Sequence, residues 1–143
     1  MAIEQLSVFA ENRFGTTLSV TETLGKAGID IRALNVADAE GFGILRMIVD
    51  DTEKARRVLQ EAECIVSLSP VLGVYIPDTP GGLSEVLKLM AAHKINIEYL
   101  YAFIVKSSVN ACVVMRVRDH EAAEKILQEA GIRLITEEDI QGL

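Results

Sequence analysis

Hydrophobic positions along the chain follow two spacings, one typical of strands and one typical of helices. From residue 5 to residue 10 every second position is apolar, which predicts a short half-buried strand. The stretches that follow predict a helix over 18–27, strands over 29–36 and 44–49, a helix over 55–62 and a strand over 64–68, with a turn over 37–43. The predicted order of elements in this half is βαββαβ.

The second half of the chain repeats this pattern. Residues 15–34 (GTTLSVTETLGKAGIDIRAL) and 81–100 (GGLSEVLKLMAAHKINIEYL) share a leading glycine, a helix-like middle and a closing Ile-polar-Ile triplet at the same spacing. The string LQEA occurs at 59–62 and again at 127–130. Internal repetition of this kind predicts two copies of one small α/β unit.

The second copy is predicted to hold the same elements as the first, with two more residues in the hairpin between its second and third strands. Its elements are a strand over 71–76, a helix over 83–90, strands over 95–104 and 111–117, a helix over 123–130 and a strand over 132–136, with a turn over 105–110 and a polar tail over 137–143. The predicted helix caps are Thr16 or Thr17, the stretch Asp50-Asp51-Thr52, and Asp119, and Gly28 is the predicted stop of the first helix.

A βαββαβ unit is typical of the ferredoxin-like α+β fold, an antiparallel four-stranded sheet with both helices on one face. The repeat predicts two such units in tandem, at 1–69 and 70–143, with Ser69-Pro70 as the whole linker. A unit of about 70 residues buries little core alone. We therefore expect the two halves to pack against each other and the protein to form a homodimer.

Composition and charge exclude several classes of protein. Half of the 143 residues are hydrophobic and the net charge is −7, so the chain is compact rather than disordered, and phosphate backbones of nucleic acids are electrostatically disfavoured. No apolar run is long enough to span a membrane, and the first residues lack the features of a signal peptide, so we expect a cytoplasmic protein without a membrane partner. Cys64 and Cys112 each lie in an apolar run and are predicted to be buried thiols.

Three functional uses of the fold can be tested against the residues. An RNA-binding version needs aromatic side chains on its central strands, and the third strand of each copy has none. A metal-binding version needs a cluster of ligands, whereas His93 and His120 lie in different elements and are interpreted as solvated residues at helix ends. No catalytic motif is present, and the carboxylates fall on polar helix faces. The sequence predicts a protein that is not an enzyme and has no cofactor or metal.

Of the polar stretches in each copy, the turn after the first strand offers the most groups that could bind a ligand. Backbone N–H groups at a helix start are unpaired and carry partial positive charge, and a neighbouring glycine lets a ligand approach them closely. The carboxylate of an amino acid suits such a place, and its ammonium group could meet Asp78, Asn12 or Asn96. These residues can also serve the backbone alone, with Gly15 and Gly81 permitting a tight turn.

The second copy carries a more specific pattern. A strand, the stretch DTPGGLSEV from Asp78 to Val86, and a helix that ends in HKINI at 93–97 resemble the signature of the ACT domain, a small-molecule-binding regulatory module. The first copy is similar but has Phe14 where the pattern has proline, and Thr17 where the second copy has Leu83. The resemblance covers nearly the whole chain as two tandem copies.

Membership of that family would imply a regulatory protein whose sheets pair side by side and which binds amino acids at the interface between two modules. The ligand contacts carried over by the resemblance come from the loop after the first strand and from the start of the second strand. They are Asn12, Phe14, Gly15, Thr16, Asp30 and Ile31 in the first copy, and Asp78, Thr79, Gly81, Gly82, Asn96 and Ile97 in the second.

The resemblance leads to two hypotheses. The first is a non-enzymatic regulatory module whose ligand, an amino acid, biases a partner enzyme or regulator or an oligomeric state. A pocket lined by Phe14, Ile31 and Ile97 would suit a branched-chain or aromatic side chain. The alternative is a structural or protein-interaction subunit with a degenerate pocket, since the Phe14 ring could fill the cavity of the first copy.

Overall fold

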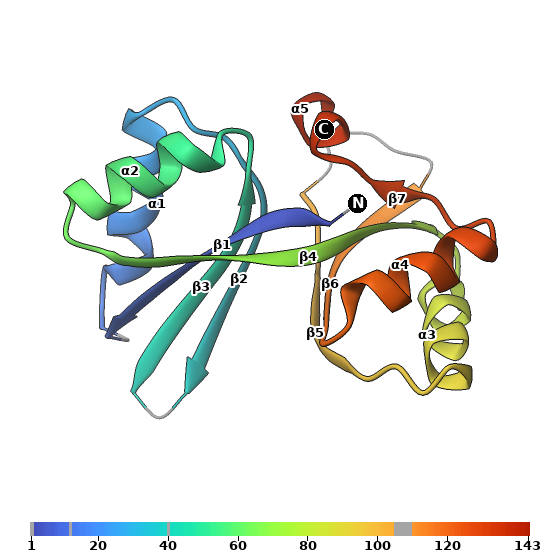
Figure 1. Ribbon diagram of the computed structural model, residues 1–143. Helices are drawn as coiled ribbons and strands as arrows, with labels where there is room; N and C mark the ends of the chain where they lie inside the picture. Colours follow the sequence, from blue (N-terminus) through green and yellow to red (C-terminus); the bar gives the residue numbers. More distant parts are fainter. Residues whose placement is uncertain (1, 12, 40, 105–109) are drawn as a thin grey trace. The chain divides into compact units, whose positions relative to one another are not determined.

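The computed structural model describes residues 2–11, 13–39, 41–104 and 110–143 (Figure 1). Their packing divides them into two compact units. The N-terminal unit is Glu4–Ser69, and the C-terminal unit is Pro70–Leu143 together with Ala2 and Ile3. Each unit is described in turn.

The N-terminal unit contains β1 (Ile3–Glu11), α1 (Thr16–Lys26), β2 (Ile31–Ala39), β3 (Phe42–Val49), α2 (Thr52–Glu61) and the first residues of β4 (Ile65–Pro77). Its strands are ordered β2-β3-β1-β4, and β1 and β2 both pair antiparallel with β3. Helices α1 and α2 lie together on one face of this sheet (Figure 1). The core between sheet and helices is built from alternate strand residues and one stripe of each helix, including Leu6, Val8, Leu45, Met47, Val20, Leu24, Ala55 and Leu59.

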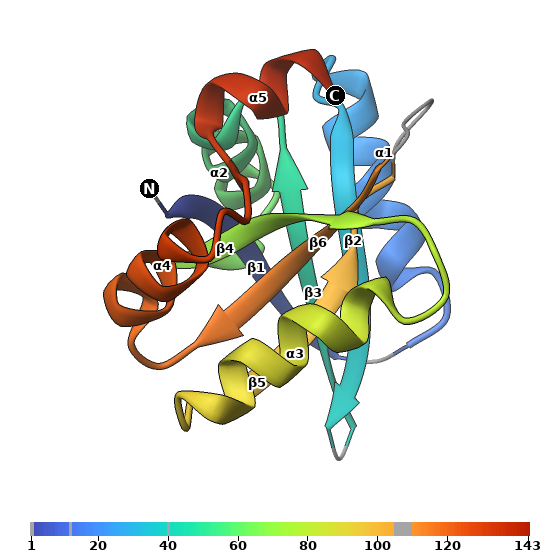
Figure 2. The ribbon, with the colours of Figure 1, turned by 90° about the vertical axis from the view of Figure 1, so that its right-hand side faces the viewer.

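The C-terminal unit contains the remainder of β4, then α3 (Gly82–Ala92), β5 (Ile97–Ala102), β6 (Asn110–Val117), α4 (His120–Glu129), β7 (Leu134–Ile135) and α5 (Glu137–Gly142). Its strands are ordered β7-β4-β6-β5. Helices α3 and α4 run side by side over the sheet (Figure 2). The predicted apolar stripe of α3 is confirmed, because Val86 and Met90 are buried while Leu83 and Leu87 pack against the same core.

Both units therefore have the ferredoxin-like α+β fold that the hydrophobic pattern predicts. The confirmed local signals include the N-caps Asp51 and Asp119, whose carboxylates accept hydrogen bonds of 3.1 Å from the backbone N–H groups of Lys54 and Ala122. Gly28 follows the C-cap of α1 with a φ of 74°, the left-handed conformation that ends a helix.

The predicted side-chain cap of α1 is wrong. Neither Thr16 nor Thr17 caps the helix, because Gly15 occupies the N-cap position and supplies no side chain. Leu18 begins the predicted apolar stripe of this helix, but it is 60% exposed, whereas Val20 and Leu24 are buried. The apolar stripe of α1 is therefore narrower than the sequence indicates.

The predicted linker Ser69-Pro70 falls where the two units meet in the chain, but it is not a break between strands, because both residues lie inside β4. Proline lacks a backbone N–H but keeps its carbonyl group, and the Pro70 oxygen accepts a hydrogen bond of 2.6 Å from Nη1 of Arg116 on β6. One long strand thus supplies the last strand of the first fold and the first strand of the second.

The hairpin of the first copy and the C-terminal tail also differ from the sequence pattern. The predicted turn over 37–43 is shorter, because β2 reaches Ala39 and β3 begins at Phe42. Most of the predicted turn over 105–110 falls outside the described residues. The polar tail forms α5, which Thr136 and Asp139 begin with a reciprocal capping box and which buries Ile140.

The two cysteines differ in burial, and the described residues hold no candidate metal cluster. Cys112 is buried as predicted, whereas Cys64 is only half-buried, and burial raises the pKa of both thiols. Among the residues that the structure describes, no three His, Cys, Asp or Glu side chains are grouped so that they could hold a metal ion. No helix within these ranges is long and apolar enough to cross a membrane.

Candidate functional site

The two loops that follow β1 and β4 end in the same backbone conformation. Gly15 precedes α1 with φ 84° and ψ −2°, and Gly81 precedes α3 with φ 85° and ψ −3°. Both are left-handed N-caps without a side-chain cap hydrogen bond, and a Cβ placed on either glycine would meet no atom within 4 Å. The helical ladders begin at Ser19, which donates to the Gly15 carbonyl at 2.9 Å, and at Glu85, which donates to the Gly81 carbonyl at 3.1 Å.

The N-terminal loop exposes its aromatic residue. The side chain of Phe14 is fully exposed, so the ring fills no cavity of its own unit. Arg13 Nε forms an ion pair of 3.1 Å with Glu11. The Thr16 hydroxyl donates a hydrogen bond of 3.0 Å to the Glu11 carbonyl, which ties the start of α1 to the end of β1. Asn12 lies outside the described residues.

In the C-terminal loop, the backbone of Gly82 lies close to the backbone of Pro77. Asp78, Thr79 and Gly81 are exposed, whereas Gly82 is buried and its N–H donates to the Thr79 carbonyl at 3.0 Å. A Cβ added to Gly82 would lie 2.1 Å from the carbonyl oxygen of Pro77, so only glycine fits this approach.

Some of the residues predicted to contact a ligand at the start of the second strands already have partners within their own unit. Asp30 forms an ion pair with Nη1 of Arg32, and its backbone N–H donates to the Asp50 carboxylate at 3.0 Å. Ile31 and Ile97 are half-buried and pack against the cores of their units. Asn96 is exposed and borders a cavity of about 310 Å³, whose lining is Lys94, Ile95, Asn96, Glu98, Arg118 and Asp119.

The predicted loop residues and the predicted residues at the start of the second strand lie at opposite ends of a helix within each unit. The loop precedes α1 or α3, and the second strand begins after the same helix ends. Each helix has 11 residues and is therefore about 16 Å long. One amino acid cannot reach both groups within a single unit, so each unit brings together only half of the predicted set.

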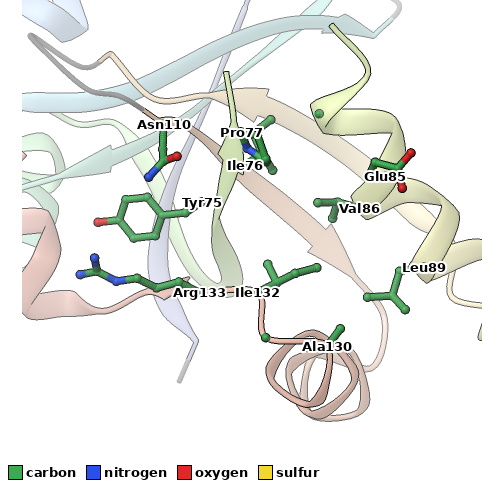
Figure 3. Close-up of a pocket in the computed structure, with 12 residues that line it drawn as sticks. Tyr75, Ile76, Pro77, Glu85, Val86, Leu89, Asn110, Ala130, Ile132 and Arg133 are labelled. Atoms are coloured by element: carbon green, nitrogen blue, oxygen red, sulfur yellow. The ribbon is translucent and has the colours of Figure 1, made fainter. Parts of the chain in front are cut away.

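A larger cavity, of about 480 Å³, lies within the C-terminal unit and was not predicted from the sequence (Figure 3). It opens between the end of β4, the first turns of α3 and the turn that joins α4 to β7. Its lining is Tyr75, Ile76, Pro77, Gly82, Glu85, Val86, Leu89, Asn110, Ala130, Gly131, Ile132 and Arg133. Gly82 is the one predicted contact residue among them.

Arg133 and Tyr75 form the polar side of this cavity. The Tyr75 N–H donates to the Arg133 carbonyl at 3.1 Å, and the Arg133 guanidinium Cζ lies 4.6 Å from the centre of the Tyr75 ring (Figure 3). Nη2 of Arg133 is 3.2 Å from an oxygen of Asp139 on α5. The Thr136 backbone N–H, together with the Thr136 hydroxyl and Arg133, holds the pKa of Asp139 below its ordinary value of 3.8, and burial raises the pKa of Tyr75.

Sequence signals for this cavity are weak. Tyr75 and Arg133 are neighbours only because β7 pairs with β4, and neither residue belongs to a recognisable motif. The available signal was the glycine pair Gly81-Gly82, in which only the first residue has a positive φ. The second position therefore requires glycine for a different reason, which is the close approach of the Pro77 carbonyl.

Comparisons with known proteins give a consistent result. A family model described as an ACT domain pair matches residues 1–143. The crystal structure of protein BT0572 from Bacteroides thetaiotaomicron is 36% identical, with 100% of this chain and 98% of that chain covered, and the TM-score is 0.91. No curated protein matches the chain significantly.

Two more distant crystal structures share the fold. The ligand-free regulatory subunit of aspartate kinase from Thermus thermophilus is 20% identical over 89% of this chain and 91% of that chain, with a TM-score of 0.58. Aspartokinase III of E. coli, in complex with lysine and aspartate, is 20% identical with a TM-score of 0.53. The match covers 90% of this chain and 30% of the aspartokinase.

Proposed function

The chain belongs to the family of ACT domain pairs, and we propose that it is a regulatory module that binds an amino acid at an interface between ACT-like domains or subunits. The observation that carries this proposal is the matched pair of helix starts. Gly15 and Gly81 have the same left-handed conformation, and neither helix start has a side-chain cap hydrogen bond. The first N–H group of each helix donates within its own loop, to the Arg13 or the Thr79 carbonyl, and the positive end of the helix dipole favours a carboxylate there.

The position of the predicted contacts supports a site shared between modules. The loop residues and the residues at the start of the second strand lie at opposite ends of each unit. A second module that runs in the opposite direction would place its own Asp30 or Asn96 beside the loop, where either side chain could accept a hydrogen bond from the ligand's ammonium group. A homodimer is therefore part of the proposal.

Amino acids are the ligand class to test first, because aspartokinase III was crystallised with lysine and aspartate. A partner enzyme or regulator is also proposed, since a structural neighbour is the regulatory subunit of aspartate kinase. A ligand that binds only the assembled protein stabilises that assembly by about 2.7 kcal/mol at one hundred times its dissociation constant. This coupling would be the regulatory output.

Thermal unfolding against the twenty amino acids at millimolar concentration tests the proposal, with size-exclusion chromatography in parallel. We expect a selective rise of several degrees, which corresponds to about one or two kcal/mol. Gly81→Val and Gly15→Val each fill the space before one helix and should remove the rise contributed by that copy. Gly25→Ala is the matched control, because Gly25 lies on the exposed face of α1 with open space around it.

A flat panel with an intact oligomer would contradict amino-acid binding and would favour a second candidate, a protein-interaction subunit. The exposure of Phe14 and Leu18 at the start of α1 favours that candidate, since large apolar side chains exposed together often mark an interaction site. In that case Phe14→Ser should weaken the oligomer or the binding of a partner, while the amino-acid panel stays flat for wild type and variant alike.

A further inference from the structure

The cavity of about 480 Å³ in the C-terminal unit has the features of a second ligand site. We propose that it binds a small molecule with a carboxylate and an apolar body, and that Arg133 holds the carboxylate. This site goes beyond the proposed function, because it lies within one unit and does not involve the start of β5. It also does not depend on how two modules assemble.

The cavity exists because several local features leave the end of β4 uncovered. Strand β7 is only two residues long, so beyond Tyr75 the edge of β4 faces the α4–β7 turn rather than a strand. Gly82 and Gly131 border the space without side chains. The volume lies within the range of about 300–1,000 Å³ that is typical of small-molecule pockets.

The chemistry of the lining is divided between two sides (Figure 3). Val86 and Leu89 of α3 point toward the cavity from one side, and Ile132 points into it from the turn after α4. Tyr75 and Arg133 lie on the other side. A ligand with an apolar body and one charged end would match both sides, with its charge at Arg133.

Arg133 is suited to hold a carboxylate. A guanidinium group has five N–H donors in a planar fork and binds carboxylates through two parallel hydrogen bonds. The bond to Asp139 uses one of these donors, and the Arg133 Cζ lies 4.6 Å from the centre of the Tyr75 ring. The Arg133 side chain is otherwise 68% exposed, and these two contacts restrict it, which lowers the entropic cost of binding.

The N-terminal copy provides an internal control because it lacks the same features. By the register of the repeat, Ile65 stands in the place of Arg133, Thr16 in the place of Gly82 and Thr23 in the place of Leu89. Glu63 stands in the place of Gly131 with a similar positive φ, 64° against 77°, so the turn is kept while the lining changes. The proposal therefore assigns this site to the C-terminal copy alone.

Titration of the full-length ¹⁵N-labelled protein with 4-methylpentanoate, followed by NMR, tests the proposal. We expect saturable shifts of the amide signals of Gly131, Ile132 and Val86 in the millimolar range, with Gly15 and Gly28 unmoved. The amine 3-methylbutylamine has an apolar body of similar size without the carboxylate, so it should cause no saturable shift at these signals. L-leucine then shows whether the site accepts an amino acid or only the free acid.

Two variants separate the carboxylate contact from the cavity itself. Arg133→Gln should raise the dissociation constant of 4-methylpentanoate at least about tenfold, since hydrogen bonds to charged groups are among the strongest polar contacts in proteins. Ala130→Leu keeps Arg133 and fills the cavity from an exposed position, so it should also abolish the shifts. Lys125→Gln removes one positive charge from the exposed face of α4 and should leave the affinity unchanged.

The outcomes distinguish this site from the one at the loops. Absence of saturable shifts at Gly131 and Ile132 in the folded protein would overturn the cavity proposal and leave the proposed function untouched. Equal affinity in wild type and Arg133→Gln would overturn it as well. Shifts at Gly131 that persist in Gly81→Val and Gly15→Val, with a flat thermal panel for all amino acids, would support the cavity while contradicting the proposed function.

Discussion

The two copies begin their first helix in the same way but join it to the preceding strand differently. The left-handed glycines Gly15 and Gly81 have nearly equal φ values, 84° and 85°. The next residue is Thr16 in one copy, whose hydroxyl bonds the Glu11 carbonyl, and Gly82 in the other, whose Cα lies against the Pro77 carbonyl. The same turn therefore holds a side-chain hydrogen bond in the first copy and a direct backbone approach in the second.

The side chains around the two helix starts also differ. The C-terminal copy combines the bare Gly82 with Tyr75 and Arg133 around one cavity, and Arg133 connects this cavity to α5 through Asp139. The N-terminal copy instead exposes Phe14 beside its helix start. Repetition has thus preserved the backbone signal while the side chains around it have diverged.

The largest effect is expected at the residue where the two copies differ most. Gly82→Ala should destabilise the protein by about 1–3 kcal/mol, because its Cβ would be forced against the Pro77 carbonyl and the backbone would have to shift. Thr16→Gly is the matched change in the first copy and removes an exposed hydrogen bond, so it should cost less. Urea unfolding of both variants measures the difference, and a cost for Gly82→Ala no larger than that for Thr16→Gly would contradict the difference between the two loops.

The next effect should be equal in the two copies. Gly15→Ala and Gly81→Ala each place a Cβ in the left-handed region, at a cost of about 1–2 kcal/mol in each copy. Neither added Cβ meets another atom within 4 Å, so backbone strain is the whole effect. Denaturation curves for the pair should show the same loss of stability. A difference larger than about 0.5 kcal/mol would contradict the equivalence of the two helix starts.

The fold of both units could be predicted from the sequence because its signals are local. The spacing of Ala55 and Leu59, and of Val86 and Met90, places each pair on one buried helix face. The continuous strand β4 was missed because Pro70 indicates a break, whereas its carbonyl still bonds Arg116. Helix α5 was missed because six residues are too few to show a helical period.

The candidate sites were less accessible to sequence reasoning. The repeat identified Gly15 and Gly81, because a conformation with positive φ needs a particular residue type. The partnership of Arg133 with Tyr75 depends on the pairing of two strands far apart in the chain, for which no local signal exists. The ligand contacts carried over by resemblance stay predictions, because they lie at opposite ends of each unit and neither unit brings the full set together.

A third test compares the second helices of the two copies, which begin identically. Asp51 and Asp119 both accept an N-cap hydrogen bond of 3.1 Å. Asp51→Ala and Asp119→Ala should each cost about 1 kcal/mol, with the same value in both copies. Asn at either position should restore most of the loss, since its side-chain oxygen can accept the same bond. Unequal costs measured by urea unfolding would show that this cap differs in a way its geometry does not reveal.

The smallest effect should belong to the one helix without a counterpart. Asp139 is ionised in the folded protein and its pKa lies below its ordinary value of 3.8, chiefly because the Thr136 backbone N–H donates to it at 3.0 Å. A carboxylate with a lowered pKa contributes stability that is present above its ordinary pKa and is lost as pH falls through the lowered value. Acid below the ordinary pKa of 3.8 should therefore loosen α5, visible as reduced hydrogen-exchange protection of Ile140, whose N–H bonds the Thr136 carbonyl.

Asp139→Asn supplies the control for this acid effect. The amide cannot titrate, so the variant should have weaker protection of Ile140 at neutral pH and no further loss caused by this position on acidification. The amides of α1 and α2 should keep their protection over the same pH interval if the loosening is confined to α5. Simultaneous loss of protection in α5 and in these helices would show instead that α5 unfolds only with the whole protein, and that the C-terminal copy holds its additional helix as firmly as its core.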